Sequence, residues 1–201
     1  MENIFESRNY VNACENTWRK YSSDMRRIRG LVEHLDTPGS LMLDVGCGTG
    51  RMRDVVCRAR YMGVDGSTVM VSRCKERGIE AYGPHSVYDL GALSDSEADV
   101  VLCHAVCCHI ADVPRAVKEL WRVTKSRLIV SMYYSWWPRH RGVRPTWVEG
   151  PTGGWFQPQN KIPAWMIYRI AQKLKPARYQ VILTKNETHI GDRLAYLVMD
   201  R

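Results

Sequence analysis

Residues 41–50 read LMLDVGCGTG, and this stretch decides the fold. Its apolar first half predicts a buried strand that ends near Val45. Its three glycines, Gly46, Gly48 and Gly50, predict a tight turn that leads into a helix. A glycine-rich turn between a strand and a helix is the place where a doubly wound parallel sheet binds a nucleotide. The stretch therefore predicts both a class of fold and the position of a binding site.

Short apolar runs alternate with helical patterns after this stretch, which predicts a parallel sheet covered by helices. The expected strands are 41–45, 61–64, 79–82, 100–103 and 128–132. The clearest helix is expected at 113–124, where an apolar stripe follows Asp112 as the N-cap. Residues 9–35 have the pattern of two helices, the second capped by Ser22 or Ser23.

The C-terminal third has a different pattern. Residues 164–174 are expected to be helical, and the apolar runs 180–184 and 194–199 have the arrangement of an antiparallel hairpin. Residues 135–160 are rich in Gly, Pro and aromatic side chains and are expected to form a long loop. Long loops of this kind usually serve function.

Composition indicates one globular domain. The chain has 201 residues, of which 45% are hydrophobic and 25% charged, as in ordinary soluble proteins. No apolar run reaches the roughly 18 residues of a membrane span, and residues 1–10 do not resemble a leader peptide, so we expect a cytoplasmic protein with no membrane partner. Seven cysteines, an odd count, are expected as reduced thiols.

The residues around the glycines indicate which nucleotide binds. A nicotinamide-binding turn requires a third glycine where Arg51 stands. Asp44 would face the pyrophosphate of a dinucleotide, and two like charges about 4 Å apart repel by roughly 4 kcal/mol at an effective dielectric constant of 20. The same carboxylate attracts an ammonium group. These residues therefore favour S-adenosylmethionine, which carries an ammonium, a sulfonium and no phosphate.

A second carboxylate supports this interpretation. Asp65 follows the second expected strand, where a carboxylate can accept hydrogen bonds from both ribose hydroxyls. The alternative is that Asp44 and Asp65 only cap the helices that follow them. Their joint occurrence beside the glycine turn favours a cofactor site.

The chain resembles the class I S-adenosylmethionine-dependent methyltransferases, in particular the small-molecule branch that includes quinone-biosynthesis enzymes. The resemblance depends on DVGCGTG at 44–50, GVDGS at 63–67 and ADVVLCHAVCCHIADVPRAVKELWRV at 98–123, and it covers about 41–133. It implies a Rossmann-like doubly wound α/β fold, with a seven-stranded sheet whose last strand is antiparallel and with helices on both faces. It also implies a transferase that moves a methyl group to a small-molecule acceptor by in-line displacement.

The resemblance also implies which single residues contact the cofactor. Asp89 is the nearest match to an acid beside the adenine, and His104 follows the fourth strand, where the family places a residue against the cofactor. A histidine that only packs at a strand end is the alternative for His104. The cofactor-binding residues that the resemblance implies are Asp44, Gly46, Cys47, Gly48, Gly50, Asp65, Gly66, Asp89 and His104.

The N-terminal helices add weaker candidates. In many relatives such a segment covers the cofactor, so Tyr21 and Arg26 are expected to contact it, Arg26 through the methionine carboxylate. Tyr10 and Trp18 lie on the same segment. Aromatic residues at helical spacing that simply fill the core are the alternative.

Two histidines are candidate catalytic bases. Imidazole titrates near neutral pH, so His104 or His109 can take a proton from the acceptor. The alternative for His109 is an ordinary position at the start of a helix. The resemblance lacks the paired acidic ligands of metal-dependent relatives, so we expect no catalytic metal. Residues 103–106 also lack the Asn/Asp-Pro-Pro-Tyr/Phe signature of many nucleic-acid methyltransferases.

The acceptor is expected to bind to aromatic and basic residues that follow the fifth strand. These residues are Tyr133, Tyr134, Trp136, Trp137 and Arg139. Aromatic walls with an arginine suit a planar or sugar acceptor that carries an anionic group. A folded lid or an oligomer interface is the alternative for these tryptophans. The oligomeric state, and the acceptor itself, stay open.

Two other functions fit parts of the sequence. The net charge of +8, together with stacking aromatics beside arginines, also suits RNA, so an RNA or protein methyltransferase is the second choice. Cys103, Cys107 and Cys108 suggest a thiophilic acceptor, although core packing is favoured for them.

We expect a single domain of four parts. These are a helical cap (1–38), a cofactor-binding core (39–134), a substrate-side loop (135–160) and a C-terminal helix and hairpin (161–201).

Overall fold

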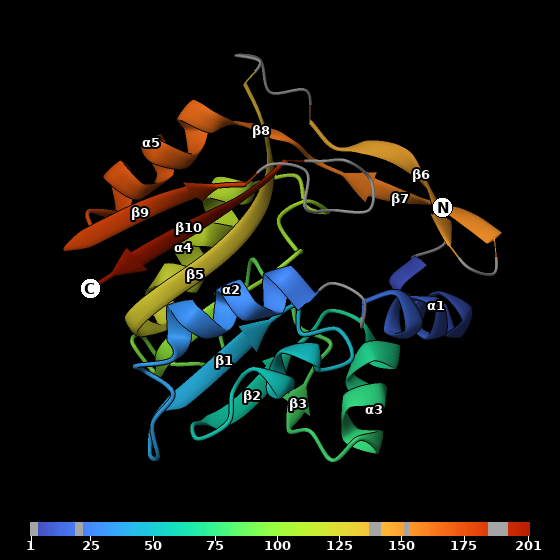
Figure 1. Ribbon diagram of the computed structural model, residues 1–201, viewed down its shortest axis with the longest axis horizontal. Helices are drawn as coiled ribbons and strands as arrows, with labels where there is room; N and C mark the ends of the chain where they lie inside the picture. Colours follow the sequence, from blue (N-terminus) through green and yellow to red (C-terminus); the bar gives the residue numbers. More distant parts are fainter. Residues whose placement is uncertain (1–3, 19–21, 137–141, 151–152, 185–192) are drawn as a thin grey trace.

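A mixed sheet organises the computed structural model, which describes residues 4–18, 22–136, 142–150, 153–184 and 193–201 (Figure 1). Seven strands follow the order β3-β2-β1-β4-β5-β10-β9, and an eighth, β8, pairs with β5 off this path. The strands are β1 (Leu41–Val45), β2 (Arg60–Val64), β3 (Ala81–Tyr82), β4 (Ala98–Cys103), β5 (Thr124–Ser135), β8 (Ile162–Pro163), β9 (Arg178–Leu183) and β10 (Leu194–Asp200).

The pairing of these strands confirms the predicted topology. β1 runs parallel to β2 on one side and to β4 on the other, and β4 runs parallel to β5. β10 is antiparallel to both of its neighbours, with Leu197 opposite Val130 of β5 and Val181 of β9. Consecutive apolar residues suit the central strands because helices cover both faces of a parallel sheet.

Helices cover the two faces of the sheet (Figure 1). α4 (Val113–Val123) and α5 (Ala164–Leu174) pack in one hydrophobic cluster with β4 and β5, and α2 (Ser22–Val32) packs in a second cluster on the opposite face. α4 has the predicted apolar stripe, and the side chain of Asp112 accepts a hydrogen bond from the Arg115 amide at 3.1 Å as its N-cap. The remaining helices are α1 (Arg8–Trp18), α3 (Thr68–Glu76) and the short 3-10 helices η1 (Ile4–Glu6) and η2 (Arg51–Asp54).

The prediction of a long loop at 135–160 is wrong for most of this segment. It contains an antiparallel hairpin of β6 (Arg144–Gly150) and β7 (Gly153–Gln159), in which Trp147 lies opposite Phe156 with ring centroids 5.0 Å apart. The Gly and Pro residues suggested a loop, but the glycines stand at the two ends of the turn, where strands can be joined. The hairpin extends from the sheet towards α1 (Figure 1).

Other sequence expectations are met with small differences. The strand expected at 79–82 is shorter, as β3, and the two predicted N-terminal helices are α1 and α2. α2 begins at Ser22, but the side chains of Ser22 and Ser23 lie outside the described residues. Within the described part of the chain, no helix is both long and apolar enough to cross a bilayer.

Candidate active site

A cavity of about 380 Å³ opens at the carboxyl ends of β1, β2 and β4. β1 lies between β2 and β4, and the chain continues from β2 to β3 on one side of β1 and from β4 to β5 on the other, so this edge is the topological switch point of the sheet. The glycine turn after β1 forms the floor of the cavity, and the N-terminal segment contributes Phe5 and Tyr10 to its wall. The cavity thus lies at the position that residues 41–50 predict.

The glycine turn is built on a backbone conformation that other residues rarely adopt. Gly46 has a φ of 74°, and its amide and that of Cys47 donate hydrogen bonds to the carbonyl oxygen of Val64 at 2.7 and 3.1 Å. A Cβ atom at Gly46 would lie 2.1 Å from Cγ2 of Val106, which also lines the cavity. Only glycine allows the chain to pass here and the turn to stay open to a ligand.

Asp65 joins the turn after β1 to the turn after β2. Its Oδ2 accepts a hydrogen bond from the Gly48 amide at 2.8 Å, and its Oδ1 accepts one from the Ser67 amide at 2.8 Å. Burial raises the pKa of Asp65, while these backbone donors oppose the change. A carboxylate has about four acceptor positions, so Asp65 can still accept a hydrogen bond from a ligand in the cavity.

Asp44 lies at the end of β1 and is only 1% exposed. The hydroxyl group of Tyr61 donates a hydrogen bond to its Oδ2 at 2.6 Å. Burial raises the pKa of Asp44 to about 7; the Tyr61 hydrogen bond opposes this increase and the charge of Asp65 adds to it. A cation in the cavity would therefore shift this carboxyl towards its ionised form.

The helix-cap alternative for the two acids is wrong. Ser67 caps α3, because its Oγ accepts a hydrogen bond from the Met70 amide, and η2 follows Gly50 with no side-chain cap. Asp44 and Asp65 instead face the cavity.

His104 lies beside the buried carboxylate of Asp24 from α2. Its Nε2 is 3.8 Å from Asp24 Oδ2, and its ring is stacked on Tyr196, whose hydroxyl donates to Asp24 Oδ1 at 3.0 Å. Burial, with a smaller contribution from the charge of Arg51, lowers the pKa of His104 to about 3. His104 Nδ1 is buried and has no hydrogen-bond partner among the described residues, although the ring lines the cavity.

His109 has a defined tautomer. Its Nδ1 lies 2.7 Å from the carbonyl oxygen of Pro158, and a carbonyl oxygen only accepts, so Nδ1 carries the hydrogen. Burial lowers the pKa of His109, so the ring is neutral and its Nε2 keeps a lone pair. The ring of Phe5 lies 5.3 Å from the His109 ring, and both line the cavity.

The cavity brings together most of the residues that the sequence singled out. Those that line it are Asp44, Gly46, Cys47, Gly48, Asp65, Gly66, His104, His109, Tyr133 and Tyr10. The Cys74 thiol, with Sγ 4.0 Å away, and burial raise the pKa of the Cys47 thiol, so it packs as a neutral group.

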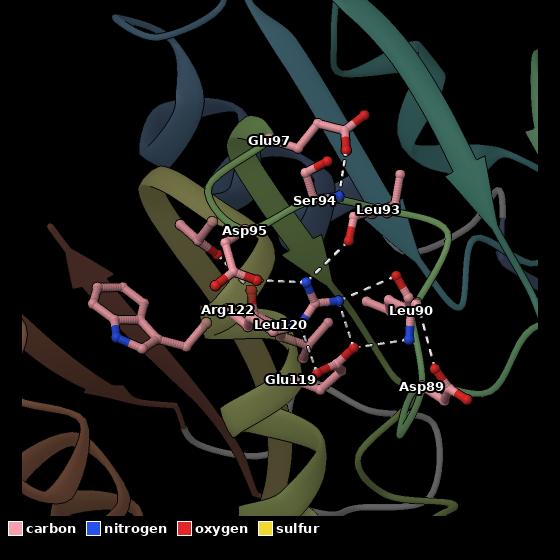
Figure 2. A network of polar contacts seen from close by, with 12 residues as sticks. Asp89, Leu90, Leu93, Ser94, Asp95, Glu97, Glu119, Leu120 and Arg122 are labelled. Carbon is pink, nitrogen blue, oxygen red and sulfur yellow. Dashed lines mark hydrogen bonds and ion pairs between the residues drawn. The ribbon is translucent and has the colours of Figure 1, made fainter.

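Asp89 does not line the cavity. Its side chain is exposed, and its Oδ1 accepts a hydrogen bond from the Gly91 amide at 3.0 Å. Figure 2 shows it at the border of a network in which Arg122 binds Glu119 and Asp95. Residues 85–88, immediately before it, line the cavity instead.

Other predicted contacts lie outside the cavity. Tyr134 is buried and donates to the Thr184 carbonyl at 3.4 Å, and Trp136 is 63% exposed with its ring against Tyr134. Arg26 is exposed on α2, and Gly50 is buried behind the turn. Cys103, Cys107 and Cys108 are buried in the two clusters. Tyr21, Trp137 and Arg139 are outside the described residues.

Several lining residues were not among the candidates. Arg51, Ser67 and Ile110 line the cavity, as do Phe5 and Tyr88. Arg51 and Ser67 directly follow the two recognised turns, so their place in the sequence was a usable signal. Phe5 had no signal, because it reaches the cavity only through the path of the N-terminal segment.

Comparison with known proteins agrees with this geometry. Residues 43–130 match the family model described as a methyltransferase domain. Ubiquinone biosynthesis O-methyltransferases from Xanthomonas oryzae pv. oryzae (strain PXO99A) and Hahella chejuensis are 30% and 27% identical to the chain over 106 residues. These alignments cover 49% of this chain and 44% of each relative, so the chain spans less than half the length of the curated relatives it matches.

Solved structures share the fold. A SAM-dependent methyltransferase from Thermotoga maritima has a TM-score of 0.68 at 18% identity, covering 100% of this chain and 99% of that one. Magnesium protoporphyrin IX methyltransferase from Synechocystis PCC 6803, with bound SAH, has a TM-score of 0.66 at 16% identity over 89% of this chain and 82% of that one. The fold of the chain is therefore that of class I S-adenosylmethionine-dependent methyltransferases, and residues 43–130 match the methyltransferase-domain model within it.

Proposed function

We propose that the protein binds S-adenosylmethionine and transfers its methyl group to a small-molecule acceptor. The observation that carries this proposal is the pair of carboxylates, the buried Asp44 and the partly buried Asp65, which line one cavity together with the glycine turn. Ubiquinone biosynthesis and magnesium protoporphyrin IX methyltransferases among the similar proteins support a small-molecule acceptor.

The residues of the cavity fit this cofactor. Asp65 has acceptor positions left for ribose hydroxyls, and the carboxyl of Asp44 can balance an ammonium group. The missing side chain of Gly46 lets Val106, which also lines the cavity, pack against the turn, and the buried His104 Nδ1 lacks a partner among the described residues that a bound polar group can supply. When bound, the cofactor supplies a methyl group on a sulfonium, so the chain mainly has to orient the acceptor and exclude water.

Arg51 is the residue we assign to the methionine carboxylate. It lines the cavity, and its charge acts on both Asp24 and His104. Arg26, for which this contact was expected, has an exposed side chain that does not line the cavity. An arginine binds a carboxylate with two parallel hydrogen bonds, which would fix the amino-acid end of the cofactor.

His109 is the base we assign to the reaction. Its Nε2 lone pair can accept the proton of an acceptor hydroxyl while the oxygen forms its bond to the methyl group and the sulfur–carbon bond breaks. His104 was the other candidate, but a pKa of about 3 makes it a weak base near neutral pH. Phe5, Tyr10 and Tyr133 supply aromatic walls for a planar acceptor. The anionic group of the acceptor, which Arg139 was expected to bind, stays a prediction.

Titration calorimetry tests the cofactor. We expect binding of S-adenosylmethionine and none of NAD; the reverse result would overturn the proposal. A radiolabelled methyl donor supplied with a metabolite extract then identifies the acceptor by the labelled product. We also propose a cytoplasmic location, which the unbridged cysteines of the described residues support.

RNA is a second candidate acceptor, and the solvent face of α5 favours it. Trp165 and Tyr168 are 47% and 39% exposed, and Arg169 and Lys173 are exposed on the same helix. Residues 150–186 contain no Asp or Glu. Aromatic rings between cations suit single-stranded nucleic acid. A steep loss of RNA affinity with added salt is expected if this surface binds phosphates, and no measurable RNA binding at low salt would exclude it.

A further inference from the structure

We propose that Asn160 is a positioning residue that holds His109 in the tautomer required of a base. The inference rests on the proposed role of His109 and concerns how the chain prepares it. Asn160 follows β7 and is 1% exposed. It is far from His109 in the sequence, and it lies outside the glycine turns.

Three hydrogen bonds join the His109 turn to the end of the β6–β7 hairpin. The Asn160 amide donates to the Cys108 carbonyl at 2.6 Å, and Asn160 Nδ2 donates to the Ile110 carbonyl at 2.7 Å. In the opposite direction, His109 Nδ1 donates to the Pro158 carbonyl at 2.7 Å. Asn160 therefore hydrogen bonds to the residues on both sides of His109. These bonds hold the Pro158 carbonyl opposite the His109 ring.

The direction of the third bond decides the chemistry. A neutral imidazole has one hydrogen, and the Pro158 carbonyl requires it on Nδ1, which leaves the lone pair on Nε2. The Phe5 ring also lies beside His109, with centroids 5.3 Å apart, but an aromatic ring cannot select which nitrogen carries the hydrogen. The tautomer thus depends on the position of one backbone carbonyl.

The side chain of Asn160 is the part of this arrangement that a substitution can remove. Backbone donors and acceptors stay in every variant, and Pro158 contributes only its carbonyl. Asn160→Ala removes the donor to Ile110, and Asn160→Asp replaces the donor with a carboxylate oxygen that repels the Ile110 carbonyl. Both variants release the turn on one side of His109 without touching the histidine.

Nitrogen-15 NMR of the histidine rings tests the proposal without any acceptor. In the wild-type protein near pH 8, we expect the His109 shifts of a protonated Nδ1 and an unprotonated Nε2. In Asn160→Ala and Asn160→Asp we expect averaged shifts of two exchanging tautomers. Gln159→Ala is the matched control, because Gln159 is a buried amide on the same strand whose Nε2 has no partner in the described part of the chain. Its spectrum should equal that of the wild type.

Two results would overturn the proposal. One is a wild-type His109 with its hydrogen on Nε2, which is decisive even if both Asn160 variants fail to fold. The other is a folded Asn160 variant whose His109 shifts match the wild type.

Activity and binding separate this inference from the proposed function. With an identified acceptor, Asn160→Ala should lower kcat by at least about tenfold and shift its pH profile, while the Kd for S-adenosylmethionine stays within about twofold. If the wild-type protein did not bind S-adenosylmethionine, the proposed function would be refuted, and the tautomer measurement would still be valid. An Asn160→Ala enzyme with unchanged kcat and pH profile would contradict the positioning role.

Discussion

The two walls of the cavity are built in different ways. The carboxylate wall, with Asp44, Asp65 and the glycine turn, comes from one continuous unit of strand, turn, helix and strand. The histidine wall combines His109 with Phe5 of the N-terminal segment and Pro158 of the hairpin. Tyr10 and Gln157, which hydrogen bond at 3.5 Å beside it, are 147 positions apart in the sequence.

The difference shows how each wall holds its chemistry. On the carboxylate wall, backbone amides of neighbouring turns bind Asp65 and the hydroxyl group of Tyr61 on β2 binds Asp44, so the geometry is local. On the histidine wall, the ring is oriented by segments that meet only after the sheet has formed. Substitutions on the first wall should therefore affect cofactor binding, and substitutions on the second should affect catalysis while leaving cofactor binding largely intact.

Gly46→Ala should have the largest effect on the carboxylate wall. The new Cβ would overlap Val106 Cγ2, and the residue would be held at a φ of 74°. We expect cofactor affinity to fall by more than about 100-fold, together with a loss of stability of roughly 1–3 kcal/mol from the strained backbone. Calorimetry and thermal unfolding measure the two effects.

Gly39→Ala is the matched control for this change. Gly39 also has a positive φ, 89°, but nothing lies within 4 Å of the position of its Cβ, and it does not line the cavity. The control should lose stability and keep its affinity. Equal affinity losses in both variants would show that backbone strain, and not the contact with Val106, is responsible.

Asp65→Asn should have the next largest effect. The change weakens the charged hydrogen bonds expected to the ribose, which corresponds to about 1.5–3 kcal/mol, or roughly 10- to 150-fold in Kd. Asp36→Asn is the control, because Asp36 accepts three backbone hydrogen bonds, from Cys57, Arg58 and Ala59, away from the cavity. It should lower the melting temperature without changing Kd. Wild-type affinity in Asp65→Asn would remove this residue from the site.

Cofactor affinity should depend on pH through Asp44. Its pKa of about 7 means that the cation-binding carboxylate is largely protonated at pH 6 and ionised at pH 8, so affinity should rise about tenfold over this interval. The wild type without ligand should show the opposite trend in stability. Because the native state holds an extra proton between about pH 4 and pH 7, its stability falls as the pH rises through that range.

Asp44→Asn should make both profiles flatter, as calorimetry and denaturant titration at several pH values can measure. A wild-type affinity that does not change between pH 6 and pH 8 would contradict a role for the ionisation of Asp44.

Asp89→Ala should have the smallest effect. Asp89 is exposed and binds only the Gly91 amide nearby, so cofactor affinity should stay within about twofold of the wild type. Tyr88→Ala, one position earlier, lies in the cavity wall and should weaken binding more. A larger loss for Asp89→Ala than for Tyr88→Ala would support the adenine contact that the sequence predicted and would contradict the placement seen here.

The sequence correctly predicted those parts of the site that depend on local structure. β1 was predicted with its bounds, and the acids at the ends of β1 and β2 were placed at the cavity, because strand and turn patterns are short-range properties. It failed for the hairpin, where Gly and Pro suggested a loop although Trp147 and Phe156 pair across two strands. Cross-strand pairing depends on register, which a single segment does not reveal.

The sequence alone determined the first strand, the glycine turn and the carboxylates that favour a cationic nucleotide cofactor, because each depends on residues within one strand–turn–helix unit. Only the tertiary structure decided that His109 has a fixed tautomer and that the pKa of His104 lies far below neutral pH. That difference arises from burial around His104 and from the Pro158 carbonyl beside His109. Both are contacts between segments distant in the sequence, and such contacts exist only once the core has packed.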